Sequence, residues 1–403
     1  MIDDTSKVQM KAARTASAEK GINTLTMTEF FLYLALIINL LYSLFYPVYT
    51  ALHAIFHFIV LAFAVGIFAA ELRIKVNLKK VIALTVFVGL TVAAILINHS
   101  GLGLVINILW PLTIIYIFKN SRLSSSYINK ITVLMLVGWI IALLATVTYN
   151  EQFFANFEAG IVPENVNPNT MAIIIVFTSL FLQLYIDSAS KNKRVKIAIY
   201  LVSFAALYRT RSRTSLVAFA VILLMEIIAK KKIKNSKVMG MVIPVAVIIA
   251  GIVFPFVYTL LFTRGIISYH TLFLGKRIYT GRQYIWLNLW EYLLQHKNAF
   301  LWGVGYNTEL YSRGTFNLHN AYLSIFAQYG IPLFLFQIWY ILRSFNGMYN
   351  KYGQISDLQF KCYQILVYVL IVGFGEGVLS YLPNMIFIAM AIGIGSREKL
   401  GDM

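Results

Sequence analysis

The sequence contains little cysteine and few charged residues, and among the charged residues acids are fewer than bases. Its single cysteine, Cys362, excludes an internal disulfide and a cysteine-based metal cluster. Charged residues make up 12% of the chain, whereas about a quarter is usual in a soluble domain. Asp and Glu number 16 against 34 Lys and Arg. These shortages exclude a water-soluble enzyme.

Long apolar runs take the place of the missing charge. Hydrophobic residues account for 59% of the chain, and the mean hydropathy is +0.74. A helix needs about 20 mostly apolar residues to cross a bilayer. Twelve stretches approach this length: 28–47, 50–70, 80–97, 102–118, 130–148, 170–187, 197–209, 214–229, 238–262, 319–343, 361–382 and 384–396. The polar N-terminus lacks the features of a cleaved signal peptide, so we expect none.

The distribution of Lys and Arg predicts the orientation in the membrane. Alternate connectors, together with both termini, hold 25 of the 34 basic residues, and cytoplasmic connectors are the basic ones. We therefore predict an all-α polytopic membrane protein with about 12 transmembrane helices and cytoplasmic N- and C-termini. The basic clusters lie beside apolar runs, where they suit anionic lipid headgroups. Membrane lipids are thus expected partners, and nucleic acid is not.

One stretch of this chain is long and polar enough to carry chemistry. Residues 263–318 form a predicted large extracytoplasmic loop, and within it residues 281–298 have the spacing of an amphipathic helix with Trp286 and Trp290. The predicted organisation is a cytoplasmic tail (1–27), transmembrane helices 1–9 (28–262), the outer loop (263–318), transmembrane helices 10–12 (319–396) and a cytoplasmic tail (397–403).

Nine basic residues lie on the predicted outer side, against the general bias. Three of them, Arg209, Arg211 and Arg213, share one short turn, and the other six lie in the 263–318 loop. Outer arginines work against correct insertion, so a compensating use is expected. Guanidinium groups offer rigid donors that suit phosphate oxygens. The turn therefore predicts a site for a lipid-linked diphosphate, although headgroup contact at a helix end would also explain one arginine.

Further candidate residues lie in and after the loop. Arg282 precedes the amphipathic helix, whose N-terminus favours anions. His319 and Asn320 close the loop at the membrane boundary, where a histidine can exchange a proton. Glu376 is predicted inside the eleventh helix, toward its outer half, where an intramembrane carboxylate pairs with an outer arginine or lines a watery cavity. No acidic pair on an outer loop predicts a metal site, so we expect neither metal nor cofactor.

The order of these motifs resembles the O-antigen polymerase (Wzy) and O-antigen ligase superfamily. The resemblance covers roughly residues 170–345 and includes Ser212–Thr214, Gly281–Arg282, the Gly303-Val-Gly305 turn, His319–Asn320 and Gly330. The ligase pattern favours Gly, Thr or Tyr three residues beyond that last glycine. This chain has Leu333 there, which favours a polymerase.

The resemblance implies a role for each matched residue. Arg213 and Arg282 would bind a polyprenyl-diphosphate leaving group, with Arg209 and Arg211 as auxiliary cations. His319 would lie beside the acceptor hydroxyl and activate or orient it. Asn320 and Glu376 stay further candidates. The implied partners are a polyprenyl-diphosphate-linked oligosaccharide, a chain-length regulator and a flippase.

The sequence thus predicts a glycosyltransferase in a bacterial plasma (inner) membrane. It would polymerise lipid-linked repeat units into a capsule, exopolysaccharide or O-antigen on the outer face. An O-antigen ligase differs from this only in its acceptor. A flippase with 12 helices is the alternative of another class, but transporters commonly contain repeats, and the two halves of this sequence show no similarity.

Overall fold

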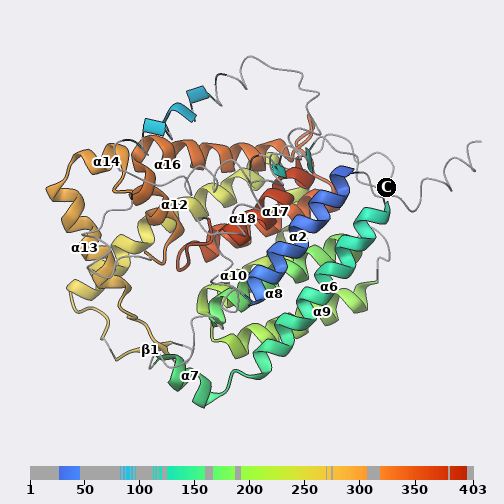
Figure 1. Cartoon of the computed structure of the whole chain (residues 1–403), viewed down its shortest axis with the longest axis horizontal. Helices are drawn as coiled ribbons and strands as arrows, with labels where there is room; N and C mark the ends of the chain where they lie inside the picture. The colour runs from blue at the N-terminus through green and yellow to red at the C-terminus, as the bar shows by residue number, and fades with distance from the viewer. Residues whose placement is uncertain are drawn as a thin grey trace, which may run out of the picture.

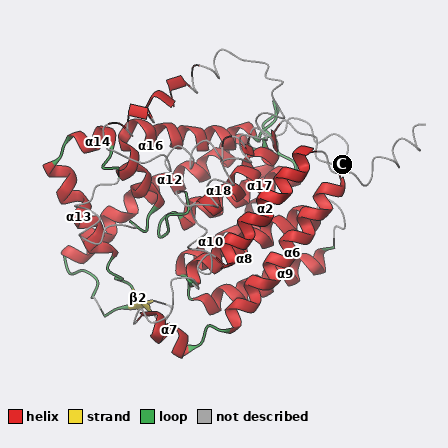
Figure 2. Ribbon diagram, in the orientation of Figure 1, coloured by secondary structure: helices red, strands yellow, loops and turns green. Residues whose placement is uncertain are grey.

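The computed structural model describes most of the chain in continuous segments. These are residues 27–45, 125–158, 167–186, 192–268, 270–273, 276–305, 318–379 and 382–396, together with isolated residues between 82 and 119. The described part is almost entirely helical (Figure 2). The predicted second, third and fourth transmembrane helices fall largely outside it, so the count of 12 stays a prediction.

The nine other predicted transmembrane segments are all helical, with shifted ends. The helices are α2 (Met27–Phe45), α6 (Ser125–Val147), α8 (Pro168–Tyr185), α9 (Lys193–Thr210), α10 (Arg213–Leu224) with the π-helical turn η4 (Met225–Ala229), α12 (Lys237–Thr263), α16 (Ala321–Gly347), α17 (Asp357–Val372) and α18 (Leu382–Gly395). Among the described residues, three helices are long and apolar enough to cross a membrane: Asn129–Val147, Lys237–Thr263 and Ala321–Gly347. The structure therefore supports a helical membrane protein.

Helices α8 and α17 form the centre of the bundle, as Figure 1 shows. Apolar side chains are buried all round both helices, which is the pattern of a helix enclosed by others. The surrounding helices expose large apolar side chains instead, as Leu201 and Leu144 do with 66% and 63% exposure. An exposed apolar surface of this kind suits contact with lipid.

Small residues let α12 approach its neighbours closely. The ring of Tyr349 fills the space beside Gly240, and that of Tyr322 fills the space beside Gly251. The hydroxyl of Tyr322 donates to the carbonyl of Leu370 at 2.8 Å. Glycine at a helix contact is typical of membrane bundles. The glycine contacts join α12 to the first turn of α16 and to the turn that follows α16, and the Tyr322 hydrogen bond joins α16 to α17.

The segment between α12 and α16 is partly ordered into secondary structure. It contains the hairpin β1 (Leu272–Phe273) and β2 (Lys276–Arg277), helix α13 (Arg282–Gln295) and helix α14 (Asn298–Trp302). The predicted amphipathic helix is thus present as α13. In Figure 1, α13 and α14 lie side by side at the left of the bundle, and β1 lies next to the short helix α7 (Glu151–Glu158).

The prediction that Glu376 lies inside a helix was wrong. Helix α17 ends at Val372, and residues 373–376 form a turn. Gly373 and Gly375 lie within this turn and Gly377 follows it. Glycine is unfavourable within helices, which explains why α17 ends here. The same sequence prediction began the helix at Lys361, but α17 begins four residues earlier, at Asp357. Lys361 is consequently buried within the helix and not exposed in a connector.

Candidate functional site

Three segments that are distant in sequence bring their charged side chains to the same end of the bundle. Arg213 is the first residue of α10, Arg282 is the first residue of α13, and His319 lies two residues before α16. The turn after α17 adds Glu376. We call these four residues the outer cluster, after the side of the membrane on which the sequence predicts them.

Glu376 connects Arg282 to the bundle. Its Oε1 atom lies 3.1 Å from Nη2 of Arg282 and accepts a hydrogen bond of 2.8 Å from Nδ2 of Asn169. The Arg282 and Glu376 side chains are only 21% and 13% exposed. A charge-assisted contact that is largely shielded from water is stronger than an exposed one. The sequence predicted either an outer arginine or a watery cavity beside Glu376, and the structure places Arg282 there.

The turn before Glu376 fits closely around Arg282. A Cβ atom at Gly375 would lie 2.5 Å from Cγ2 of Thr214 and 2.9 Å from Nη1 of Arg282. Only a glycine leaves room for both neighbours at this position. The guanidinium of Arg282 is therefore fixed by an ion pair on one side and by the packing of a turn on the other.

Arg213 lies beside Arg282 and reaches toward the hairpin. Its Nη1 atom donates to the carbonyl of Arg277 at 3.0 Å, and its charge interacts with that of Arg282. The hydroxyl of Tyr258 anchors the next residue by donating to the carbonyl of Ile278 at 2.7 Å. Like charges held near one another are unfavourable unless an anion accompanies them. The pair thus favours the binding of an anionic group.

His319 is held close to Arg282 in an unusual backbone conformation. Its φ angle is +48°, in the left-handed region, which non-glycine residues seldom adopt and which is often found at functional sites. Burial, aided by the charge of Arg282, lowers the pKa of His319 to about 4. The imidazole is therefore neutral at neutral pH and can accept a hydrogen bond.

Asn320 fixes the position of His319. Its Oδ1 atom caps α16 by accepting from the backbone N–H of Leu323 at 2.8 Å, and its Nδ2 atom donates to the carbonyl of Phe374 at 3.1 Å. On the other side, the indole N–H of Trp286 donates to the carbonyl of Leu318 at 2.7 Å. Asn320 and Trp286 are both fully buried. Both therefore support the site through packing and backbone contacts.

Arg209 and Arg211 point away from the outer cluster. Arg211 adopts a left-handed conformation with φ of +51°, which makes the turn between α9 and α10 tight. Arg209 donates to the carbonyls of Thr146 and Val147 at 3.2 and 3.0 Å, at the C-terminal end of α6. Arg211 forms an ion pair with Glu151 of α7. Of the three arginines in this turn, Arg213 alone faces Arg282.

The Gly303 turn makes a backbone contact. Gly303 has φ of +83°, and a Cβ atom there would lie 2.5 Å from the carbonyl oxygen of Gln328. Gly330 kinks α16 directly opposite, and a Cβ atom there would overlap the carbonyl of Leu301. The close approach of α14 to α16 therefore explains the glycines at positions 303 and 330.

A known protein family matches the part of the chain that contains the two arginines and the histidine of the outer cluster. A family model described as O-antigen ligase matches residues 198–338. The matched segment contains Arg213, Arg282 and His319. It supports the O-antigen ligase superfamily and a membrane enzyme of ligase or polymerase type in polysaccharide synthesis. Searches of curated proteins and of solved structures gave no match.

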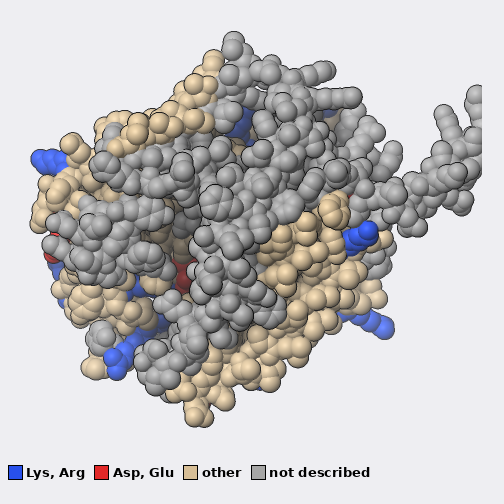
Figure 3. Space-filling view, viewed as in Figure 1, with Lys and Arg blue, Asp and Glu red and all other residues tan. Residues whose placement is uncertain are grey.

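A second charged cluster was not singled out in the sequence. Glu226, in η4, contacts Lys196 at 2.7 Å and Lys361 at 2.6 Å. Lys230 links Glu226 to Asp357 with contacts of 3.3 and 2.9 Å. We call these five residues the inner cluster. The feature of the sequence that could have revealed this cluster is Glu226, a carboxylate within the apolar run 214–229. In Figure 3, basic side chains lie toward two opposite edges of the molecule.

Proposed function

We propose that the protein is a membrane glycosyltransferase that polymerises polyprenyl-diphosphate-linked oligosaccharide repeat units into a surface polysaccharide. The observation that carries the proposal is the meeting of Arg213, Arg282 and His319 at one end of the bundle. Two cations suit the diphosphate of the donor, and a neutral histidine suits the hydroxyl of an acceptor. The proposed site faces outward in a bacterial inner membrane.

The proposed reaction is a single glycosyl transfer. The oxygen of an acceptor hydroxyl forms a bond with the anomeric carbon of the donor sugar, and the bond from that carbon to the diphosphate oxygen breaks. Negative charge then develops on the departing diphosphate, where Arg213 and Arg282 stabilise it. The hydroxyl proton passes to His319 or to water. Since the diphosphate leaves readily, the proposed step needs no metal.

His319 acts in this scheme mainly by orienting the acceptor. A group with a pKa of about 4 is a weak base at neutral pH, but it accepts a hydrogen bond well. Binding of the diphosphate would offset the charge of Arg282, which helps to hold that pKa down. The imidazole would then become more basic when the donor is in place, and proton transfer would follow donor binding.

An O-antigen ligase is the second candidate, because the matching family model carries that description. The same cations and histidine would serve either reaction. The two functions differ in the acceptor, which is a further lipid-linked repeat unit for a polymerase and a different lipid-linked glycan for a ligase. A chain-length regulator and a flippase are proposed partners of the polymerase alone.

Reconstitution of the full-length protein in liposomes tests the proposal. The protein is given lipid-diphosphate-linked repeat units in the presence of a chelator, and the products are sized on a gel. We expect a ladder of polymers. A product that appears only when a lipid A-type acceptor is added would establish a ligase. Repeat units that cross the bilayer unchanged would establish a flippase and overturn the proposal.

A further inference from the structure

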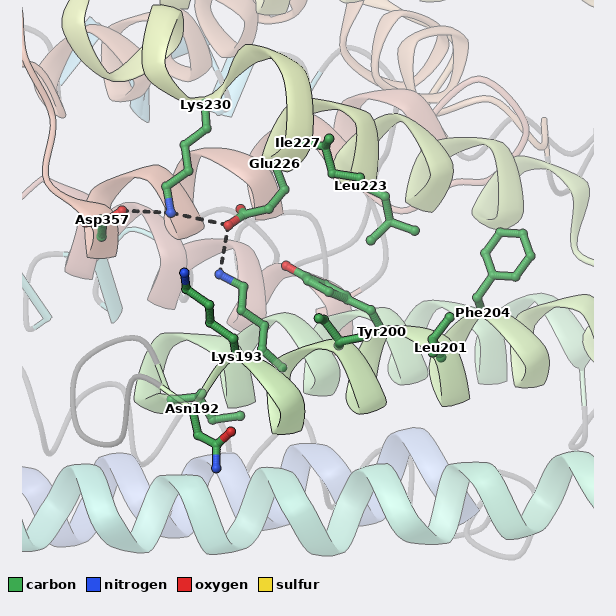
Figure 4. A pocket seen from close by; sticks show the side chains of 13 residues that line it. Asn192, Lys193, Tyr200, Leu201, Phe204, Leu223, Glu226, Ile227, Lys230 and Asp357 are labelled. Atoms are coloured by element: carbon green, nitrogen blue, oxygen red, sulfur yellow. Dashed lines mark hydrogen bonds and ion pairs between the residues drawn. The ribbon is translucent and has the colours of Figure 1, made fainter.

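A pocket of about 810 Å³ lies between α9 and the α10–η4–α11 segment, at the opposite end of these helices from the outer cluster. Helix α11 covers Lys230–Asn235. The volume is within the range of about 300–1,000 Å³ that is common for small-ligand sites. Figure 4 shows its lining, with lysines and carboxylates at one end and apolar side chains at the other. The residues therefore divide the pocket into a polar and an apolar half.

The polar half carries more positive than negative charge. Its two carboxylates are Glu226 and Asp357, and each is contacted by lysines. Glu226 contacts Lys196, Lys230 and Lys361, and Asp357 contacts Lys230 and Lys234. Lys196 and Lys230 line the pocket, whereas Lys234 and Lys361 are not among its lining residues. Together these four lysines exceed the two carboxylates by a net charge of +2.

Lys193 adds a third excess positive charge. It is exposed, lines the pocket and extends from the first turn of α9 toward Asp357 and Lys230 (Figure 4). It forms no ion pair with another described residue. The other two lysines that line the pocket, Lys196 and Lys230, are engaged with carboxylates. Lys193 is consequently the cation best placed to meet an anionic ligand.

The apolar half continues onto the outer surface of the bundle. Leu201 is 66% exposed and Ile227 is 79% exposed, while Phe204 is 38% exposed. Figure 4 shows these side chains lining the far end of the same pocket. Apolar surface that is exposed next to a transmembrane bundle is covered by acyl chains. The pocket thus leads from a basic rim directly to the hydrocarbon region.

The wall of the pocket is locally irregular. Glu226 and Ile227 belong to the π-helical turn η4, which follows α10 without a break. Single π-helical turns inserted in α-helices occur frequently at functional sites. The irregular turn lets Glu226 reach the lysines while Ile227 lines the apolar half. The π-helical turn is thus a second feature, separate from the positive charge, that is typical of a ligand site.

We propose that this pocket binds a phosphate-bearing lipid from the leaflet at this end of the bundle, which the basic bias predicts to be cytoplasmic. The phosphate lies against Lys193 and the excess positive charge, and one acyl chain follows Leu201, Phe204 and Ile227. Basic residues at this depth attract anionic headgroups. The site lies apart from the outer cluster and serves no step of the proposed transfer reaction.

Native mass spectrometry of the full-length protein in detergent tests the lipid site. Delipidated protein is titrated with dioleoyl-phosphatidylglycerol and, separately, with dioleoylglycerol, which lacks the phosphate. We expect tighter binding of the phospholipid. Lys193→Gln should weaken that binding about fivefold, which corresponds to the loss of one headgroup contact. Arg194→Gln is the matched control, because Arg194 is exposed on the same helical turn but does not line the pocket.

Three outcomes would overturn the proposal. The first is equal binding of the two lipids, and the second is an equal effect of the Lys193 and Arg194 substitutions. The third is displacement of the phospholipid by excess glycerol phosphate, which would indicate a site for a soluble anion. A second variant examines the apolar half: Leu201→Gln should weaken phospholipid binding more than Leu224→Gln, since Leu224 is 54% exposed but lies outside the pocket lining.

Discussion

Each end of the helix bundle holds a cluster of charged side chains, and the two clusters differ in how their charges are paired. In the inner cluster, Glu226 contacts Lys196, Lys230 and Lys361, and Lys361 is fully buried. In the outer cluster, Glu376 pairs with Arg282, while Arg213 forms no ion pair with another described residue. A buried ion pair holds helices together, whereas a cation without a carboxylate partner favours an anionic ligand. The comparison separates the structural role of Lys361 from the binding role proposed for the cations of the outer cluster and for Lys193.

The largest expected effect is on stability at the inner cluster. Lys361 is fully buried, and its Nζ donates to Glu226, Tyr200 and Gln364 at 2.6, 2.9 and 2.9 Å. Lys361→Met should lower the free energy of unfolding by about 3–5 kcal/mol, because Glu226, Tyr200 and Gln364 all lose a partner in one largely enclosed network. Thermal unfolding in detergent measures this. Lys351→Met, at an exposed position, serves as the control and should unfold like the wild type.

Removal of an outer arginine should affect catalysis more than stability. Arg282→Ala or Arg213→Ala should lower the initial rate of polymer formation about 10²–10³-fold, as expected when one donor to developing negative charge is lost. Rates are compared at equal amounts of folded protein. Arg264→Ala removes an exposed arginine from the same loop and should retain activity. Similar rates in all three variants would contradict the assignment of the outer cluster.

Adding a methyl group beside Arg282 tests whether the position of its guanidinium matters, without changing any charge. Gly375→Ala would place Cβ against Thr214 and Arg282 and displace the guanidinium. The rate should fall by up to about 100-fold, since small displacements of a catalytic group have effects of that size. Gly347→Ala is the matched control, because a Cβ atom there has nothing within 4 Å. If the two alanine variants had equal rates, the position of Arg282 would not limit catalysis.

The pH dependence of the outer cluster follows from His319. Its pKa of about 4 in the folded protein lies below the usual value of about 6.5. The unfolded state therefore binds a proton first, and the free energy of unfolding should fall as the pH drops from about 6.5 toward 4. His319→Asn should lack this part of the acid sensitivity. Denaturant titrations at several pH values measure the difference, and parallel curves for the two proteins would contradict the expectation.

Arg209 provides the smallest predicted effect and a test between two roles. As a donor to the last carbonyls of α6, it should contribute about 1 kcal/mol to stability. Arg209→Ala should lower the polymerisation rate by no more than a few-fold, far less than Arg282→Ala. A loss of activity as large as that of Arg282→Ala, with stability unchanged, would restore Arg209 as a diphosphate ligand.

Much of the outer cluster was predicted from residue type and position. Arg213 and Arg282 were proposed from their place in outer connectors, and His319 from the family resemblance; the structure brings them to the same end of the bundle. Arg209 and Arg211 carry the same type of side chain in the same turn, yet they face α6 and α7. Residue type does not reveal this divergence, because it depends on the left-handed backbone at Arg211.

The sequence by itself determined that this is a helical membrane protein, since the length of apolar runs and the bias of Lys and Arg depend only on composition and order. It also predicted which residues could bind a diphosphate. The tertiary structure decided which of them meet. Glu376 reaches Arg282 across 94 positions because glycines end α17 early and let the turn fold over α13. Lys361 reaches Glu226 across 135 positions because α17 extends further at its start, and such distant pairings arise only when helices pack.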